Sequence, residues 1–233
     1  MKISSCGLSD IGRIRRVNQD SFVCNEKVKL FIIADGMGGH QAGEVASRMA
    51  VDTLCQFFAQ KTVSIDPETY LKQAILKANE IIYHQASLDE SLKGMGTTLT
   101  CLYFFFDTVY IAHVGDSRAY LLNKNYIWQL SMDHSLQQIP ITSGLAPLKN
   151  VLTRSVGYDA QVEVDVYTKK ISSGEYYLLC SDGLYGSVKH SEMVKILSQD
   201  VSLKDVCRKL IDLANSRGGE DNITVMVIRI DDV

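Results

Sequence analysis

Two apolar runs, each ending in an aspartate and a glycine, constrain this chain more than any other feature. They occupy residues 30–36 and 176–183, and they end in Asp35-Gly36 and Asp182-Gly183. Continuous apolar runs of this length are typical of buried strands. A single Asp-Gly pair is most often an ordinary turn. A carboxylate at the mouth of a strand, beside a free backbone carbonyl, also suits a metal ion, and the repetition of this pattern favours that interpretation.

The remaining segments predict an α+β fold. Helical periodicity covers residues 43–59, 66–85, 191–197 and a segment that begins with a capping box at Ser202 and Asp205. β-rich runs cover 21–25, 162–166 and 223–230, and those within 97–131 predict an antiparallel meander. Strands and helices gathered in blocks indicate two central antiparallel sheets with a helical layer on each outer face. With no linker or repeat, we expect residues 1–233 to form a single domain.

Composition excludes several classes of function. The net charge is -3, so we expect no nucleic-acid partner. No apolar run is long enough to cross a bilayer, and the first residues lack the apolar stretch of a signal peptide. The six cysteines form no CxxC pair, which argues against a zinc site and favours reduced thiols. We therefore expect a cytoplasmic protein that makes no membrane contact, and we expect a monomer.

Acidic residues at predicted strand ends indicate the chemistry. Besides Asp35 and Asp182, they are Asp20, Asp116 and Asp221. Gathered at one rim, such carboxylates would repel each other unless cations intervened. Oxygen ligands without histidine or cysteine select hard ions such as Mg²⁺ or Mn²⁺, and two such ions could activate a water molecule toward phosphorus.

Other phosphate chemistries fit the sequence less well. No cysteine is followed at the sixth position by arginine, as a cysteine-based phosphatase requires, and the GxxxxGK[ST] loop is absent. Arg15 lies close in sequence to Asp20, and a guanidinium matches a phosphate bidentately. Arg15 is therefore the candidate for binding the substrate phosphate.

These segments together resemble the metal-dependent protein serine/threonine phosphatases of the 2C type (PP2C), in their compact bacterial form. The matching segments follow the family order and are residues 15–20, 34–43, 94–98, 113–118, 133–135, 150–154, 181–183 and 220–224. The resemblance implies a four-layer αββα sandwich. It also implies hydrolysis of phosphoserine and phosphothreonine on proteins by a hydroxide that bridges two Mn²⁺ or Mg²⁺ ions.

The resemblance also implies roles for individual residues. Asp35 would bridge both ions, Gly36 would offer its carbonyl to one, and Asp182 with Asp221 would complete the shell of the other. Asp20 would hold a metal-bound water.

Three further roles follow from the same resemblance. Asp116 with Asp182 resembles the site of a weaker third ion, although Gly186 stands where some members carry another carboxylate. Asn222 would support Asp221 from behind. Arg15 would hold the substrate phosphate, and phosphorylated proteins, with a Hanks-type kinase and its targets, would be the partners.

Departures from the family pattern leave points open. Met37 stands where many relatives have a histidine proposed as general acid, and the flap at 135–150 is short.

Two alternative functions also stay open at this point. One is a non-catalytic phosphoprotein-binding regulator on the same fold, and the other is a dimetal phosphohydrolase for small phosphate esters.

Overall fold

The computed structural model describes residues 1–38, 42–60, 66–123, 126–136 and 151–233. The two main sheets are antiparallel, as predicted. The first, here the β12 sheet, has the order β1 (Lys2–Asp10), β13 (Ile223–Asp232), β12 (Tyr176–Cys180), β7 (Arg118–Asn123) and β8 (Tyr126–Gln129). The second, here the β3 sheet, has the order β11 (Asp165–Lys170), β6 (Thr108–Val114), β5 (Leu99–Phe105), β3 (Leu30–Met37) and β2 (Asp20–Asn25).

Shorter strands and the helices complete the fold. The pair β9 (Ser135–Leu136) and β10 (Val151–Leu152) forms a small ribbon, and β4 (Gly96–Thr97) pairs with β3. The helices are α1 (Ala42–Ala59), α2 (Pro67–Leu88), the 3-10 turn η1 (Glu90–Leu92), α3 (Asp182–Tyr185), α4 (His190–Leu197) and α5 (Leu203–Ser216). Among the described residues, none of these helices has the length and apolarity needed to span a membrane.

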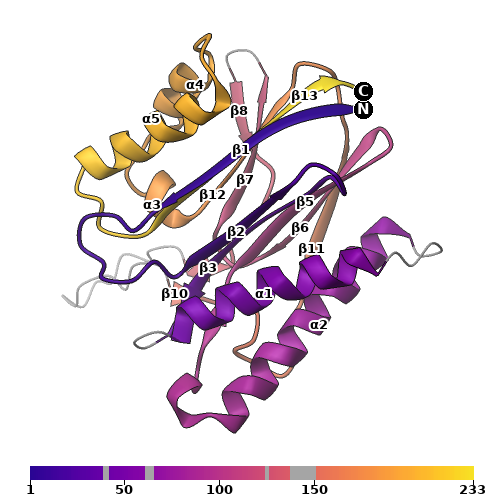
Figure 1. The fold of residues 1–233 in the computed structure, drawn as a ribbon, viewed down its shortest axis with the longest axis vertical. Coiled ribbons are helices and arrows are strands. Elements are labelled where there is room, and N and C mark those ends of the chain that lie inside the picture. Colours follow the sequence, from indigo (N-terminus) through magenta and orange to yellow (C-terminus); the bar gives the residue numbers. More distant parts are fainter. Residues whose placement is uncertain (39–41, 61–65, 124–125, 137–150) are drawn as a thin grey trace.

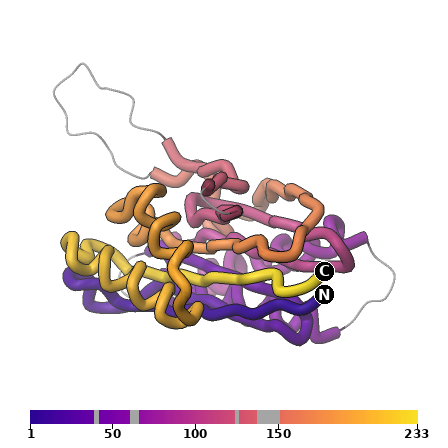
Figure 2. Tube along the Cα trace, turned by 90° about the horizontal axis from the view of Figure 1, so that it is seen from above, coloured from indigo at the N-terminus to yellow at the C-terminus, as the bar shows by residue number. Residues whose placement is uncertain are grey.

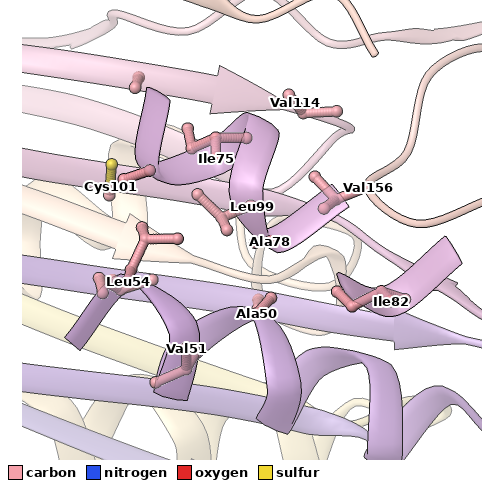
Figure 3. Packing of buried hydrophobic residues seen from close by; sticks show 14 of the residues in the cluster. Ala50, Val51, Leu54, Ile75, Ala78, Ile82, Leu99, Cys101, Val114 and Val156 are labelled. Carbon is pink, nitrogen blue, oxygen red and sulfur yellow. The ribbon is translucent and has the colours of Figure 1, made fainter. Parts of the chain in front are cut away.

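Three apolar clusters separate four layers. The helices α1 and α2 cover the outer face of the β3 sheet, and α4 and α5 cover that of the β12 sheet (Figure 1). In the first interface, side chains of both helices gather against Leu99 and Cys101 (Figure 3). The third cluster lies between the two sheets. The predicted αββα arrangement is therefore confirmed.

Alternation along β3 explains its continuous apolar run. Leu30, Ile32 and Ala34 belong to the cluster under α1 and α2, whereas Phe31 and Ile33 belong to the cluster between the sheets. Successive side chains of a strand point to opposite faces, and both faces of β3 are covered. A polar residue on either face would lose its contact with water, so the run stays apolar until it reaches the rim.

Several sequence predictions hold, and others need correction. The helix predicted over 43–59 is α1, and that predicted over 66–85 is α2, which extends to Leu88. Ser202 caps α5 by accepting a hydrogen bond from the Asp205 amide at 3.1 Å. The strand predicted over 162–166 instead begins at Asp165, and the nine-residue strand β1 was not predicted.

The predicted meander over 97–131 is wrong at its centre. Strands β5 and β6 pair with each other, as do β7 and β8, but β6 and β7 lie in different sheets. The chain crosses between the sheets at residues 115–117, a step too short to be distinguished from a hairpin by composition. The flap predicted over 135–150 falls mostly outside the described residues, as does His40 of the matching segment at 34–43.

The space between the sheets changes from apolar to polar at one end. Asp35 follows Phe31 and Ile33 on the inward face of β3 by alternation, and Asp20 follows from Phe22 in the same way on β2. The chain termini lie side by side at the other end of the strands (Figure 2). Asp182, which follows β12, adds an acid from the other sheet to the same rim.

Candidate active site

A cavity of about 670 Å³ opens at this polar rim. The predicted site residues that line it are Arg15, Asp35, Gly36, Asp116, Asp182, Asp221 and Asn222. Asp20 is not among the lining residues, but it is buried beneath them, and its charge acts on those of Asp35 and Asp182. The structure thus brings together all eight residues that the sequence indicated.

Asp20 is held by two hydroxyl groups from the opposite sheet. Its Oδ2 accepts hydrogen bonds from Ser181 Oγ at 2.8 Å and from Thr224 Oγ1 at 2.6 Å. Its Oδ1 is buried without a hydrogen-bond partner in the part of the chain that the structure describes. Burial, reinforced by the charges of Asp182 and Asp221 and opposed by the two hydroxyls, raises the pKa of Asp20 to about 7.

Asp35 pairs in register with Asp20 and is fixed through its backbone. Its amide donates to Thr98 Oγ1 at 2.9 Å, and its carbonyl accepts from Thr97 Oγ1 at 2.9 Å and from the Thr98 amide at 2.8 Å. Burial raises the pKa of Asp35 well above its ordinary value, and the charges of Asp20 and Asp182 raise it further. The strand end is therefore rigidly held while its carboxyl group faces other acids.

Glycines follow both key aspartates because the backbone comes close there. A Cβ on Gly36 would lie 1.9 Å from the carbonyl oxygen of Gly43, and a Cβ on Gly183 would lie 2.1 Å from that of Asn222. Neither distance is compatible with a side chain. The Asp-Gly pattern therefore reflects close packing of the segments that carry the acids.

Asp116 reaches the site at the crossover between the sheets. It follows Gly115, whose φ is +106° and whose Cβ would lie 2.6 Å from Thr98 Cβ. Asp116 is buried, and burial together with the charge of Asp182 raises its pKa to about 7. Asp116 and Asp182 thus form a second acidic pair beside the first.

Arg15 and Asn222 link the segment at 11–19 to the site. Arg15 Nη2 donates to Asp221 Oδ2 at 2.6 Å, with half of the arginine side chain exposed. Asn222 Nδ2 donates to the carbonyls of Ile11 and Val17, both at 3.0 Å, and its Oδ1 accepts from the Gln19 amide at 2.8 Å. The Asn222 side chain therefore fixes the segment that carries Arg15, while its backbone amide donates to Asp221 Oδ1 at 2.8 Å.

These residues fit hard divalent cations by their chemistry. Within the described ranges, no group of three acidic, histidine or cysteine side chains has the spacing of a formed metal-ligand cluster. The orphaned Asp20 Oδ1 and the mutual repulsion of Asp20, Asp35 and Asp182 nevertheless indicate carboxylates that a positive charge would stabilise. The described acids around this cavity offer carboxylate oxygens, which suit Mg²⁺ or Mn²⁺.

Several residues at the site were missed or misjudged from the sequence. Ser181 and Thr224 contact Asp20, and Arg154 and Tyr158 line the cavity. The only available signal was that Ser181 and Thr224 are hydroxyl residues beside the key acids. From its sequence alone, the matching segment Asp133-His134-Ser135 suits a helix start with an N-cap residue.

The structure places the segment at 133–135 differently. Asp133 forms an ion pair with Arg118, and His134 Nδ1 accepts from the Gly115 amide at 3.1 Å. Ser135 begins the strand β9 instead of a helix. This segment therefore supports the crossover at Gly115 and Asp116 from behind.

Comparison with known proteins gives a consistent result. A family model described as protein phosphatase 2C matches residues 13–224. A Listeria innocua protein named serine/threonine phosphatase stp is 40% identical, covering 94% of this chain and 93% of that protein. Protein phosphatase PhpP of Streptococcus pneumoniae is 36% identical, covering 97% and 96%. The crystal structure of the Mycobacterium tuberculosis serine/threonine phosphatase PstP/Ppp matches with a TM-score of 0.88 and 32% identity, covering 99% of each chain.

Proposed function

The chain belongs to the protein phosphatase 2C family and is a serine/threonine protein phosphatase, and we propose that it hydrolyses phosphoserine and phosphothreonine on proteins with two Mn²⁺ or Mg²⁺ ions. The observation that carries the metal-dependent part is the acidic rim itself. Asp35 lies beside its cross-strand partner Asp20 and next to Asp182, and the cavity that Asp35 and Asp182 line also holds the Arg15 guanidinium. Acids that repel each other so strongly suit a site for positive charge.

The proposed ligands are the acids that border the cavity. Asp35, the Gly36 carbonyl, Asp182 and Asp221 would hold two ions, with Asp20 behind them. Asp116 with Asp182 is the candidate pair for a weaker third ion. When bound, the ions would supply Lewis-acid activation of water and of the phosphoryl group.

The chain's own residues position the substrate and the acids. Arg15 is half-exposed and bonded to Asp221, so its guanidinium can turn toward a phosphate that enters the cavity. Asn222 fixes the segment that carries Arg15. Ser181 and Thr224 hold Asp20 in one orientation. Met37 lines the cavity and offers no acid to the leaving group, so we propose that a solvent molecule protonates the serine or threonine oxygen.

The relatives and the position of the cavity support phosphorylated proteins as the substrate class. The relatives named above are serine/threonine phosphatases, and the cavity opens at the surface, where a protein segment can reach it. We propose a Hanks-type kinase and its targets as the phosphorylated partners. We also propose that residues 1–233 act as one domain, because the cluster between the sheets joins their two halves.

The decisive experiment measures phosphate release from a phosphothreonine peptide. Protein treated with EDTA should be inactive, and Mn²⁺ should restore turnover in wild type but not in Asp182→Asn. A nucleotide monophosphate, tested in parallel, should be hydrolysed far more slowly than the peptide. Undiminished activity in EDTA would refute the metal-dependent mechanism, and faster turnover of the nucleotide would favour a phosphohydrolase for small esters.

A further inference from the structure

A second and larger cavity, of about 990 Å³, lies at the end of the strands opposite to the active site. We call it the distal cavity. Its walls come from the β2–β3 turn, the β5–β6 turn, the end of α1 and the start of α2. Strand β3 begins at Leu30 beside this cavity and ends at Met37 beside the active site. The two cavities are therefore separated by the length of the sheet.

Aromatic rings form one wall of the distal cavity. Phe58 lies with its ring centroid 4.9 Å from that of Tyr70 and 5.0 Å from that of Tyr103. Tyr103 stacks on Phe105 at 5.9 Å, and Phe105 in turn contacts Phe106 at 4.6 Å. The series runs from buried Phe58 to Phe106, which is 77% exposed at the rim. Such a wall offers a continuous apolar surface that leads from solvent into the cavity.

Two lysines give the rim a positive charge. Neither the Lys27 nor the Lys29 ammonium makes an ion pair or a hydrogen bond with any described residue, although Lys29 is only half-exposed. Asp107, an acid on the same rim, is already neutralised because both of its oxygens accept from Lys170 Nζ, at 2.6 and 2.7 Å. The terminal groups of Met1 and Val233, which also line the cavity, carry opposite charges. An anion beside Lys29 would therefore meet unpaired positive charge.

The backbone holds two of these residues in an unfavourable conformation. Lys29 has φ of +58° and Phe106 has φ of +49°, a region that favours glycine or asparagine. Strain of this kind often accompanies binding sites. Here the two strained turns place the Lys29 ammonium and the Phe106 ring at the same cavity. Glycine at either position would relieve the backbone strain.

We propose that the distal cavity binds a small amphiphilic anion, with its apolar body against the aromatic wall and its anionic head at Lys29 and Lys27. The volume lies within the range of ligand cavities, which is roughly 300–1,000 Å³. Ring faces accept a flat or acyl body, and the unpaired ammonium groups select the anionic head. The ligand class is therefore an aromatic or medium-chain acid, in contrast to the phosphoprotein of the active site.

Two fluorescent probes that differ in charge test this assignment. The anion is 8-anilino-1-naphthalenesulfonate, and the uncharged analogue is N-phenyl-1-naphthylamine. Wild type should bind one equivalent of the anion, about tenfold more tightly than the uncharged probe. Decanoate should displace the anion. Equal binding of the two probes, or non-saturable binding, would overturn the proposal.

Variants can be chosen that the backbone tolerates. Lys29→Gly and Phe106→Gly both place glycine at positive φ, so they should fold at least as well as wild type. Lys29→Gly should abolish the preference for the anion, and Phe106→Gly should weaken both probes. Lys27→Gln should reduce the preference in the same direction. The controls Lys204→Gly and Tyr126→Gly remove an exposed ammonium group and an exposed ring elsewhere on the surface and should leave probe binding unchanged. An unchanged preference in Lys29→Gly would refute the assignment.

Phosphatase activity separates this inference from the function of the active site. All of these variants lie away from the acidic rim and should hydrolyse a phosphothreonine peptide like wild type. An inactive wild type that still discriminates between the probes would leave the distal site supported. An active wild type without discrimination would refute the distal site alone.

Discussion

Asp20 and Asp35 are direct cross-strand partners at the ends of β2 and β3, and both carboxyl groups face the narrow space between the sheets. Like charges placed directly opposite each other destabilise a sheet. The pKa of each is raised, first by burial and then by neighbouring charges. Without a positive charge nearby, the ionised pair destabilises the folded protein. Changes of pH, or substitutions that remove one of the charges, should therefore change the free energy of unfolding.

The first prediction concerns the pH dependence of stability in EDTA. The pKa values of Asp20 and Asp116 are raised to about 7, so between pH 4 and 7 the folded state keeps protons that the unfolded chain releases. Their contribution therefore lowers the free energy of unfolding as pH rises through this window. Buried His113, with its pKa lowered to about 4, acts in the opposite direction. Urea unfolding at constant ionic strength measures the sum.

The variant Asp20→Asn isolates the aspartate from the other groups. It should lose part of the fall in stability between pH 4 and 7 and should melt a few degrees above wild type at pH 8 in EDTA, about 2–4 °C for each kcal/mol. Added Mn²⁺ should then stabilise wild type more than the variant. Identical pH profiles of the two proteins would show that Asp20 is not strained by its neighbours.

The second prediction concerns Arg15. Arg15→Ala should raise KM for a phosphothreonine peptide by about tenfold with a smaller change in kcat, because it removes binding that acts on the substrate and the transition state alike. Arg15→Lys should recover part of the loss, since an ammonium lacks the bidentate geometry. Arg13→Ala, in the same segment, is the control. A fall in kcat with unchanged KM would contradict a role in ground-state phosphate binding.

The third prediction concerns Asn222. Its side chain accepts one hydrogen bond and donates two to the segment at 11–19, so Asn222→Ala should cost about 2 kcal/mol of stability and raise KM in parallel with Arg15→Ala. Steady-state kinetics well below the melting temperature separate the two effects. Leu210→Ala in the core around α5 should destabilise the protein without raising KM. An Asn222→Ala protein with normal KM would exclude positioning of Arg15.

The fourth prediction compares two glycines that share a positive φ. Gly94 has φ of +74° and open space around its Cβ position, whereas Gly115 has φ of +106° and faces Thr98 at 2.6 Å. Gly94→Ala should cost about 1 kcal/mol for the backbone alone. Gly115→Ala should cost about 2 kcal/mol more because of steric overlap. Chemical denaturation measures both, and equal losses would show that the crossover at Asp116 tolerates a side chain.

The layered fold and the acidic rim could be predicted from the sequence because both depend on local patterns of residues. The run at residues 30–34 is apolar on both faces, so it predicted a covered strand, and the acids at its end and at Asp182 pointed to the rim. The starts predicted at Ser202 and at residue 66 lie within one residue of the observed helix starts.

Features that depend on pairing between distant residues could not be predicted from the sequence. The exchange of sheets at Gly115 involves neighbours far apart in the chain, so β6 and β7 looked like one hairpin. Strand β1 could not be predicted because it is half-exposed along its length and therefore has no clear apolar pattern. It also pairs with residues about two hundred positions away. The contacts of Asp20 with Ser181 and Thr224 are equally remote, and only the stacking of the sheets creates them.

The interlocking of Asp20 with Thr224 has a consequence for the newly made protein. Asp20 and Asp35 leave the ribosome early, whereas Thr224 and Asp221 emerge about two hundred residues later. Until the last strand inserts between β1 and β12, the first acids lack the hydroxyls and the carboxylate that complete their surroundings. On the proposed function, the active site would therefore be complete only once β13 has joined its sheet, and a chain that lacks β13 should release no phosphate from a phosphothreonine peptide.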